Sequence, residues 1–182
     1  MSDPRDDLLI DAQRIRSAHE GRLADWPKER RPLTIRASLE VLQTHRKVAR
    51  VGAFEVLSDE GPIVGGDGTA PTPLSLFVSA VGFAILTDLV RAFALRDLPV
   101  RDLRLEVEAD FPLGAKYGGE DTGVEASEVR WTVDIASEAP RSEIEAAIAW
   151  AERYCHAVES LRRPVPARGR YRLEGELVAE TS

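Results

Sequence analysis

The feature that most constrains the fold is a long apolar segment near the middle of the chain, preceded by a glycine-rich loop and a double-proline turn. The loop, 65–69, reads GGDGT, and Pro71 and Pro73 follow it where the apolar segment begins. Glycine tolerates positive φ, whereas proline fixes φ and fits the first turn of a helix. Thr72 precedes Pro73 and has a side chain suited to an N-cap. We therefore predict a turn that leads into one long helix over 74–93.

This predicted helix is apolar on most of its circumference, which indicates burial on all sides or a membrane span. The unbroken apolar run is too short for a bilayer, because Thr87, Asp88 and Arg91 interrupt it. We therefore predict a buried helix in a soluble protein. In a chain of 182 residues, a helix with neighbours on every side indicates that a second subunit supplies some of them. The sequence thus predicts an obligate homodimer.

Alternating apolar and polar residues predict several strands around this helix. The alternating stretches are 33–42, 100–111, 128–136 and 171–178, together with 47–57, which is either a strand pair or one bulged strand. Two further helices are predicted. The first covers 6–23, and the second begins at Ser142, whose hydroxyl forms a capping box with Glu145, and continues to Leu161. Strands joined by hairpin-length links and separated by single helices favour an α+β fold with a largely antiparallel sheet.

The length of the chain fits one domain with its own core. We expect a single domain over 1–182, made of an N-terminal helical arm (1–27) and a core (33–178). The segment between them, KERRP, reads as a charged, solvated connector.

Composition excludes several classes of function. The net charge of −7 argues against a nucleic-acid partner and against binding to an anionic membrane, since either needs a basic face. The single cysteine excludes an internal disulfide and fits a reducing compartment. The acidic start of the chain lacks the pattern of a signal peptide, so we expect a cytoplasmic protein. The three histidines show no metal-binding spacing, and no cofactor motif is present. We therefore expect no metal site and no cofactor.

The segment GGDGTAPTPLSL, followed by a buried helix and by a late cysteine near the end of a second helix, resembles the OsmC/Ohr family. The resemblance extends over about 33–178, and GGDGTAPTPLSL is its specific part. It implies an OsmC-like fold in an intertwined homodimer. Many members of that family reduce organic hydroperoxides with a cysteine pair, so the resemblance also suggests a stress-response role of the peroxiredoxin type.

The family pattern is broken at the positions that would carry this chemistry. The acidic residue that follows the proline in the family corresponds to Leu74 here, and the reactive cysteine corresponds to Ala84. Only the second, resolving cysteine has a counterpart, Cys155. Neither alanine nor leucine can attack a peroxide oxygen, so we expect the usual peroxidase reaction to be absent.

Cys155 is the remaining candidate for a catalytic residue. The predicted helix places it near a C-terminal end, with Glu152 and Glu159 as helical neighbours, and both features raise a thiol pKa. His156 is adjacent in sequence but points about 100° away on a helix, so it does not activate this thiol directly. The simplest interpretation is a small buried side chain. In the alternative, Cys155 acts alone with help from across the interface, from His156, His45 or Arg46.

The resemblance also implies that Ala84 faces a cavity that receives an apolar tail. The pocket residues we expect are Phe77, Val81, Phe83, Ala84, Asp88, Trp131, Tyr154 and Cys155. For the aromatic residues, core packing is the default alternative. Asp88 and Arg91 either belong to the cavity or mark the exposed face of the helix, because a charge on a buried helix needs a partner.

Three functions are compatible with these features. The preferred one is an OsmC-like homodimer without peroxidase activity that binds a small hydrophobic molecule at the dimer interface. The second is a one-cysteine hydroperoxide reductase or other thiol-dependent enzyme that uses Cys155. The third is an interaction protein whose N-terminal helix docks a partner.

Overall fold

The computed structural model describes residues 8–24, 32–118, 123–163 and 165–181. The elements in chain order are α1 (Ala12–Ala24), β1 (Ser38–Gln43), β2 (Arg46–Val51), β3 (Phe54–Ser58), η1 (Pro62–Val64), α2 (Pro73–Leu95), β4 (Val100–Asp110), η2 (Ala115–Tyr117), β5 (Glu128–Ser137), α3 (Arg141–Tyr154), α4 (His156–Arg162), β6 (Gly169–Leu173) and β7 (Glu176–Thr181). The fold is α+β, as the sequence predicts.

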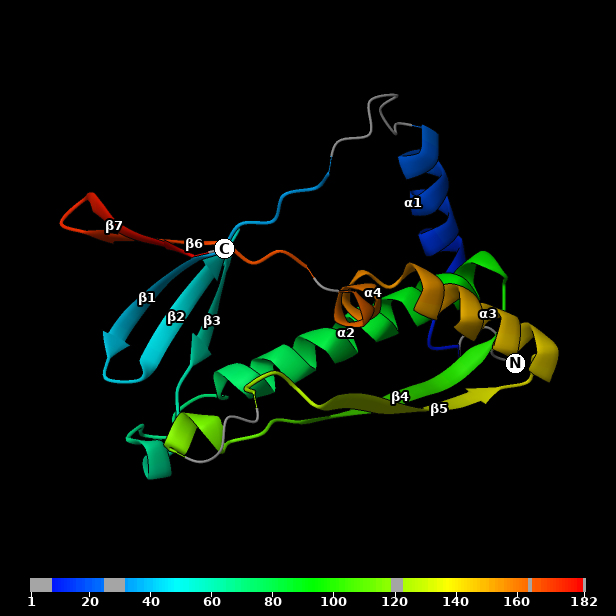
Figure 1. Cartoon of the computed structure of the whole chain (residues 1–182). Helices are drawn as coiled ribbons and strands as arrows, with labels where there is room; N and C mark the ends of the chain where they lie inside the picture. Colours follow the sequence, from blue (N-terminus) through cyan, green and yellow to red (C-terminus); the bar gives the residue numbers. More distant parts are fainter. Residues whose placement is uncertain (1–7, 25–31, 119–122, 164, 182) are drawn as a thin grey trace.

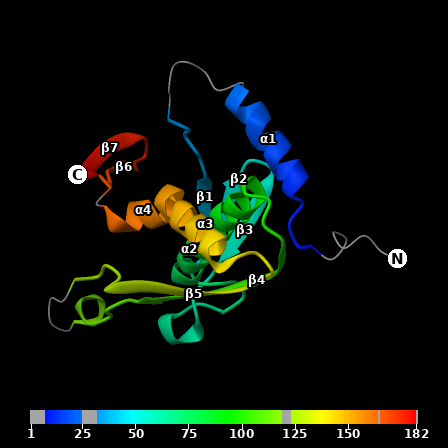
Figure 2. The same cartoon turned by 90° about the vertical axis from the view of Figure 1, so that its right-hand side faces the viewer.

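The core lies between the β4–β5 hairpin and the helices that cover one of its faces. Helix α2 packs against β4 and α3, and α4 continues the layer of α3 (Figure 1). Figure 2 shows the same helices above the hairpin when the molecule is viewed from the side. At the centre of this core, Phe93, Ala92 and Val100 are fully buried.

Helix α2 begins as the sequence predicts. Thr72 is its N-cap, and the Thr72 hydroxyl accepts a hydrogen bond from the Ser75 N–H at 3.2 Å. Pro73 occupies the first turn, where its missing N–H leaves no intrahelical bond unmade. The helix ends at Leu95, after which Asp97 adopts a positive φ of 56°.

Only part of α2 is buried within one chain. Its C-terminal half contains most of the buried positions, including Leu89 and Phe93, whereas Leu74, Phe77 and Phe83 are 48%, 41% and 70% exposed. Within one chain the helix is therefore buried on only part of its surface, and cover of the rest by a second subunit stays a prediction. The helix is long and apolar enough to cross a membrane by length and composition, but core helices of soluble proteins share these properties.

In the described part of the chain the strands form three antiparallel sheets, β1-β2-β3, β4-β5 and β6-β7. The first and third stand away from the helical layer (Figure 1). They carry exposed apolar side chains, which are Leu39, Val41, Phe54, Val56, Leu57, Tyr171, Leu173, Leu177 and Val178. One chain therefore leaves two apolar sheet surfaces uncovered.

Several predicted strand boundaries need correction. The first strand begins at Ser38 rather than at position 33. The stretch 47–57 forms the strand pair β2–β3, joined by a turn in which Gly52 has φ +60°. The stretch 171–178 contains a hairpin rather than one strand, because Glu174 and Gly175 both have positive φ, as a tight two-residue hairpin turn requires.

The helix boundaries differ as well. Helix α1 begins at Ala12, and the predicted residues 6 and 7 lie outside the described part of the chain. Helix α3 begins at Arg141 after Pro140, without a side-chain cap, so the capping box at Ser142 is wrong. The predicted single helix is also interrupted at Cys155, whose extended backbone (φ −72°, ψ 112°) separates α3 from α4.

The glycine-rich loop is held by Asp59, which is 1% exposed. One Asp59 carboxylate oxygen accepts hydrogen bonds from the Thr69 N–H and hydroxyl at 3.0 and 2.9 Å, and the other accepts from the Glu60 N–H at 2.8 Å. These bonds, led by the one from the Thr69 N–H, outweigh the opposing effect of burial and lower the pKa of Asp59 to about 2. Asp67, in the same loop, has an exposed side chain and contributes its backbone N–H to the same carboxylate.

We expect Asp59 to make stability depend on pH in the acid range. Its folded-state pKa of about 2 lies below the ordinary value of 3.8, so the ionised form stabilises the fold fully above about pH 4. This stabilisation is lost as the pH falls through 2. The melting temperature of the wild type should exceed that of Asp59→Asn by a constant amount between pH 7 and pH 5, and the difference should shrink below pH 4. A difference that stays constant down to pH 2 would contradict this assignment.

Candidate functional site

An apolar cavity of about 70 Å³ lies where α2, β5, α3 and α4 meet. Its lining is apolar except for one carboxylate and one thiol, and it consists of Ile85, Leu89, Trp131, Val133, Ile135, Ile148, Ala151, Glu152, Cys155 and Val158. Alternation along β5 points Trp131, Val133 and Ile135 into the same space. The cavity is therefore built into the main core of the chain.

Cys155 reaches this cavity because the chain is extended between α3 and α4. The side chain is 1% exposed. Burial raises the pKa of the Cys155 thiol above its ordinary value of 9.0, and the nearby Asp88 carboxylate raises it further. The backbone N–H groups of Ala157 and Val158 act in the opposite direction without reversing the shift. The cysteine is therefore a protonated thiol at neutral pH.

The carboxylate that raises the pKa of this thiol is Asp88. The sequence alone suggests Glu152 and Glu159 for this effect. It is 7% exposed, and its Oδ1 accepts a hydrogen bond from Arg91 at 3.4 Å. Glu152 and Glu159 instead pair with Arg162 at 3.1 and 3.4 Å. Because Asp88 is buried, its interpretation as part of an exposed helix face is wrong.

A wide groove of about 980 Å³ opens beside the cavity and shares two of its lining residues, Trp131 and Val158. Phe77 and Phe111 form part of the groove, with ring centroids 6.2 Å apart in an edge-to-face arrangement. Glu128 and Arg163 also line the groove, so it combines an apolar surface with charges of both signs. Trp131 and Val158 therefore lie between the groove and the cavity.

The structure brings together only some of the predicted pocket residues. Trp131 and Cys155 line the cavity, Asp88 interacts with Cys155, and Phe77 lines the adjoining groove. Val81 belongs to the buried core at 4% exposure.

The remaining predicted pocket residues lie elsewhere. Phe83 is exposed on another face of α2, where it lines two shallow hollows. Ala84 is half-buried and packs against the core rather than lining these hollows, the groove or the cavity. Tyr154 is half-exposed and packs on Trp150, with ring centroids 5.0 Å apart.

Sequence reasoning missed the aliphatic lining of the cavity, notably Ile85, Leu89 and Ala151. Helical spacing contained a usable signal, because residues 81, 85, 88 and 89 share one face of a helix whereas 83 lies on another. A wall of aliphatic residues, however, has no chemical signature that distinguishes it from packed core.

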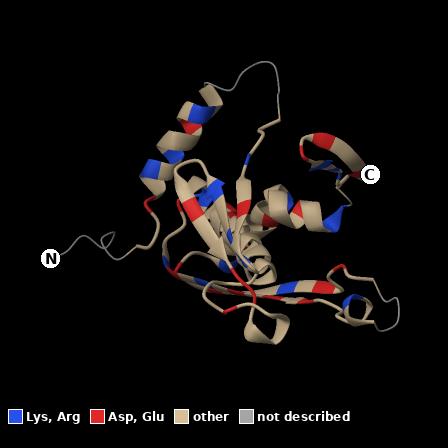
Figure 3. Ribbon diagram, turned by 90° about the vertical axis from the view of Figure 1, so that its left-hand side faces the viewer, with Lys and Arg blue, Asp and Glu red and all other residues tan. Residues whose placement is uncertain are grey.

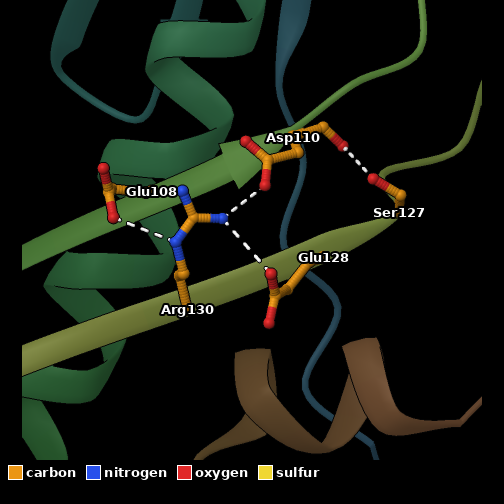
Figure 4. A network of polar contacts seen from close by, with 5 residues as sticks. All are labelled: Glu108, Asp110, Ser127, Glu128 and Arg130. Carbon is orange, nitrogen blue, oxygen red and sulfur yellow. Dashed lines mark hydrogen bonds and ion pairs between the residues drawn. The ribbon is translucent and has the colours of Figure 1, made fainter.

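Charged residues cluster at one end of the β4–β5 hairpin. Arg130 pairs with Asp110, with Glu108 at 3.0 Å and with Glu128 at 3.3 Å, while the Ser127 hydroxyl donates to the Asp110 carbonyl at 3.1 Å (Figure 4). The arginine ties together both strands at this end of the hairpin. No group of His, Cys, Asp and Glu suited to a metal ion occurs among the described residues.

Acidic and basic side chains alternate over the described elements instead of forming one large field (Figure 3). This distribution, with the net charge of −7, offers no support for a nucleic-acid-binding face.

The fold and the sequence profile identify the class of protein. The profile of the OsmC-like protein family matches residues 66–168, which is more than half of the chain. The chain therefore belongs to the OsmC-like family, whose members are generally soluble proteins. The family assignment made from the GGDGTAPTPLSL segment is confirmed.

Solved structures of the same family share the fold at low sequence identity. The OsmC-like protein from Mycoplasma pneumoniae superposes with a TM-score of 0.63 at 14% identity, over 72% of this chain and 89% of that chain. An organic hydroperoxide resistance protein OsmC from Legionella pneumophila has a TM-score of 0.56 at 17% identity, over 73% and 92%. A hydroperoxide resistance protein from Elizabethkingia anophelis has a TM-score of 0.58 at 15% identity, over 75% and 93%. No curated protein sequence matches the chain.

Proposed function

We propose that this protein is a cytoplasmic, homodimeric OsmC-like protein that binds a small apolar molecule and performs no thiol peroxidase reaction. The observation that carries the proposal is the apolar cavity in the core, whose lining includes the chain's only cysteine as a buried, protonated thiol. An apolar cavity with few polar groups favours an apolar ligand.

The protonated state of Cys155 favours a binding protein over a thiol-dependent enzyme. The thiolate, not the thiol, attacks an electrophile, and both burial and Asp88 disfavour it at Cys155. The family position of the reactive cysteine is Ala84, which has no nucleophile. These two features support a binding protein over a one-cysteine hydroperoxide reductase.

The uncovered apolar surfaces support the homodimer. The N-terminal half of α2 and the faces of β1–β3 and β6–β7 expose large apolar side chains that a single chain leaves in contact with solvent. Contiguous surfaces of this kind mark interaction sites in soluble proteins. A second copy would also place the cavity and its adjoining groove close to a subunit interface.

The third candidate function, docking of a partner on the N-terminal arm, has weaker support. Helix α1 contains no buried residue, and the chain is anchored beside it by Ile10, which is 7% exposed. Arg16 donates to the Ala94 carbonyl at 3.1 Å and pairs with Asp97 at 2.5 Å. These contacts attach the arm to its own core.

A cavity-filling variant tests ligand binding. Because the cavity measures about 70 Å³, the probe must be small, and xenon, a single apolar atom, suits it. Equilibration of the wild type with xenon should shift the NMR indole resonance of Trp131, which lines the cavity. Ala151→Leu places three more carbons in the cavity and leaves too little space for the probe, so the xenon-induced shift should be lost.

The matched control is Ala146→Leu, which makes the same change on the exposed face of α3. This variant should respond to xenon as the wild type does. Equal binding by Ala151→Leu, or a wild type whose Trp131 resonance does not respond, would refute the proposed use of the cavity.

A further inference from the structure

Phe83 projects from α2 into solvent beside a hollow on the same face of the protein. The ring is 70% exposed, an unusual position for a phenylalanine in the middle of a core helix. The hollow measures about 230 Å³ and is lined by Val78, Ser79, Gly82, Phe83, Leu86, Leu105 and Val107. An exposed aromatic side chain and an apolar depression therefore lie next to each other.

The hollow exists because two positions of α2 carry small residues. Gly82 lets the helix approach β4 so closely that a Cβ atom there would lie 3.1 Å from a Leu105 methyl carbon and 3.2 Å from a Val107 methyl carbon. Ser79, one turn earlier on α2, has a small side chain that leaves the hollow open. The floor consists of β4 side chains, and the rim consists of α2.

The size and chemistry of the hollow suit an aromatic ring. An apolar cavity of about 150 Å³ accommodates benzene, and this hollow is larger, although it is open on one side. None of its lining residues is charged. The ring of a phenylalanine would thus bury apolar surface there without desolvating an ion.

We propose that the hollow receives Phe83 of a second copy of this chain, so that two reciprocal Phe83 contacts anchor the dimer. In a twofold dimer the same patch serves both subunits, and a protruding ring beside a matching depression on one helix is self-complementary in this way. Buried aromatic anchors in pockets commonly dominate interface energies. This inference rests on the homodimer of the proposed function and names the contact that holds it together.

The apolar surface around the hollow indicates that its occupant is a second copy of the chain. The exposed apolar residues of the N-terminal half of α2, including Phe77 and Leu74, continue the patch along the same helix. Stable interfaces bury about 800 Å² per partner, which a single hollow cannot supply but an extended helix face can. A small ligand in the hollow would leave this adjoining apolar surface uncovered.

Two single variants and their mixture test the contact. Phe83→Ala removes the ring but keeps the hollow, and Ser79→Leu fills the hollow but keeps the ring. Both positions are exposed, so each variant should retain the circular dichroism of the wild type. By sedimentation velocity, each alone should dissociate at concentrations at least about tenfold higher than the wild type.

The equimolar mixture is the decisive sample. Each variant homodimer lacks both ring-in-hollow contacts. In the mixed dimer, the Phe83 ring of the Ser79→Leu subunit can enter the intact hollow of the Phe83→Ala subunit, so one contact is restored. The mixed dimer should therefore dissociate at lower concentrations than either variant homodimer. A mixture no tighter than the separate variants, or a Phe83→Ala dimer as tight as the wild type, would overturn the inference while leaving the homodimer intact. A wild type that is monomeric at micromolar concentration would instead refute the homodimer.

Discussion

Replacing Phe93 with alanine is expected to lower the free energy of unfolding by about 3–5 kcal/mol, the range typical of large-to-small changes at a buried phenylalanine. Phe93 is 0% exposed and lies where α2 meets the rest of the core. Its neighbours Ala92 and Ala94 are equally buried but are too small to fill the space that the ring would leave. The loss should therefore combine the transfer of the ring with the cost of a cavity.

Urea denaturation at one fixed protein concentration measures this loss, because the stability of a dimer depends on concentration. The control is Leu23→Ala in α1, at a side chain that is 64% exposed, which should change the free energy of unfolding by no more than about 0.5 kcal/mol. A loss below about 1.5 kcal/mol for Phe93→Ala would contradict the placement of this ring at the centre of the core.

Replacing Gly66 with alanine is expected to cost about 1–3 kcal/mol, the range of enforced backbone strain. A Cβ atom at this position would lie 2.0 Å from the Glu60 carbonyl oxygen, which belongs to the backbone and cannot rotate away. Glu60 is also fixed, because its carbonyl accepts from the Gly68 N–H at 2.9 Å and its own N–H donates to Asp59. The substitution should loosen the whole loop that precedes α2.

Gly61→Ala is the matched control in the same loop. A Cβ atom there would meet nothing within 4 Å, and Gly61 has φ −74° and ψ 163°, which alanine adopts readily. Thermal unfolding of both variants should show a clear loss for Gly66→Ala and almost none for Gly61→Ala. Equal melting temperatures for the two variants would rule out the close approach at Gly66.

The features that local sequence controls were predictable. The start of α2 follows from Thr72 and Pro73, and the alternation along β5 follows from Trp131, Val133 and Ile135. The GGDGTAPTPLSL segment predicts the family, because it combines backbone requirements that few sequences share. In each case the determining residues lie within a few positions of the feature.

Features that depend on distant partners were not predictable. The helix break at Cys155 has no glycine or proline beside it, so AERYCHAVESL reads as one continuous helix. Asp59 resembles an ordinary turn residue until Thr69, ten positions later, folds onto its carboxylate. The subunit arrangement and the single-domain boundaries stay predictions.

The candidate site shows the same division. Cys155, Asp88 and Trp131 were assigned to the pocket from residue type and approximate position. The structure places Cys155 and Trp131 in the lining of the cavity and Asp88 beside Cys155. Phe83 was assigned to the pocket on residue type alone, although its helical position directs it to another face of α2.

The most direct test of the account is a titration of the Cys155 thiol in the intact protein, followed through its ¹³Cβ chemical shift by NMR. The account predicts that Cys155 stays protonated through neutral pH and ionises only above the ordinary pKa of 9.0, because burial and the Asp88 charge disfavour the thiolate. Asp88→Asn should then lower the pKa of Cys155 toward that ordinary value. A Cys155 pKa at or below about 7, typical of reactive cysteines, would contradict the account and identify Cys155 as the nucleophile of a thiol-dependent enzyme.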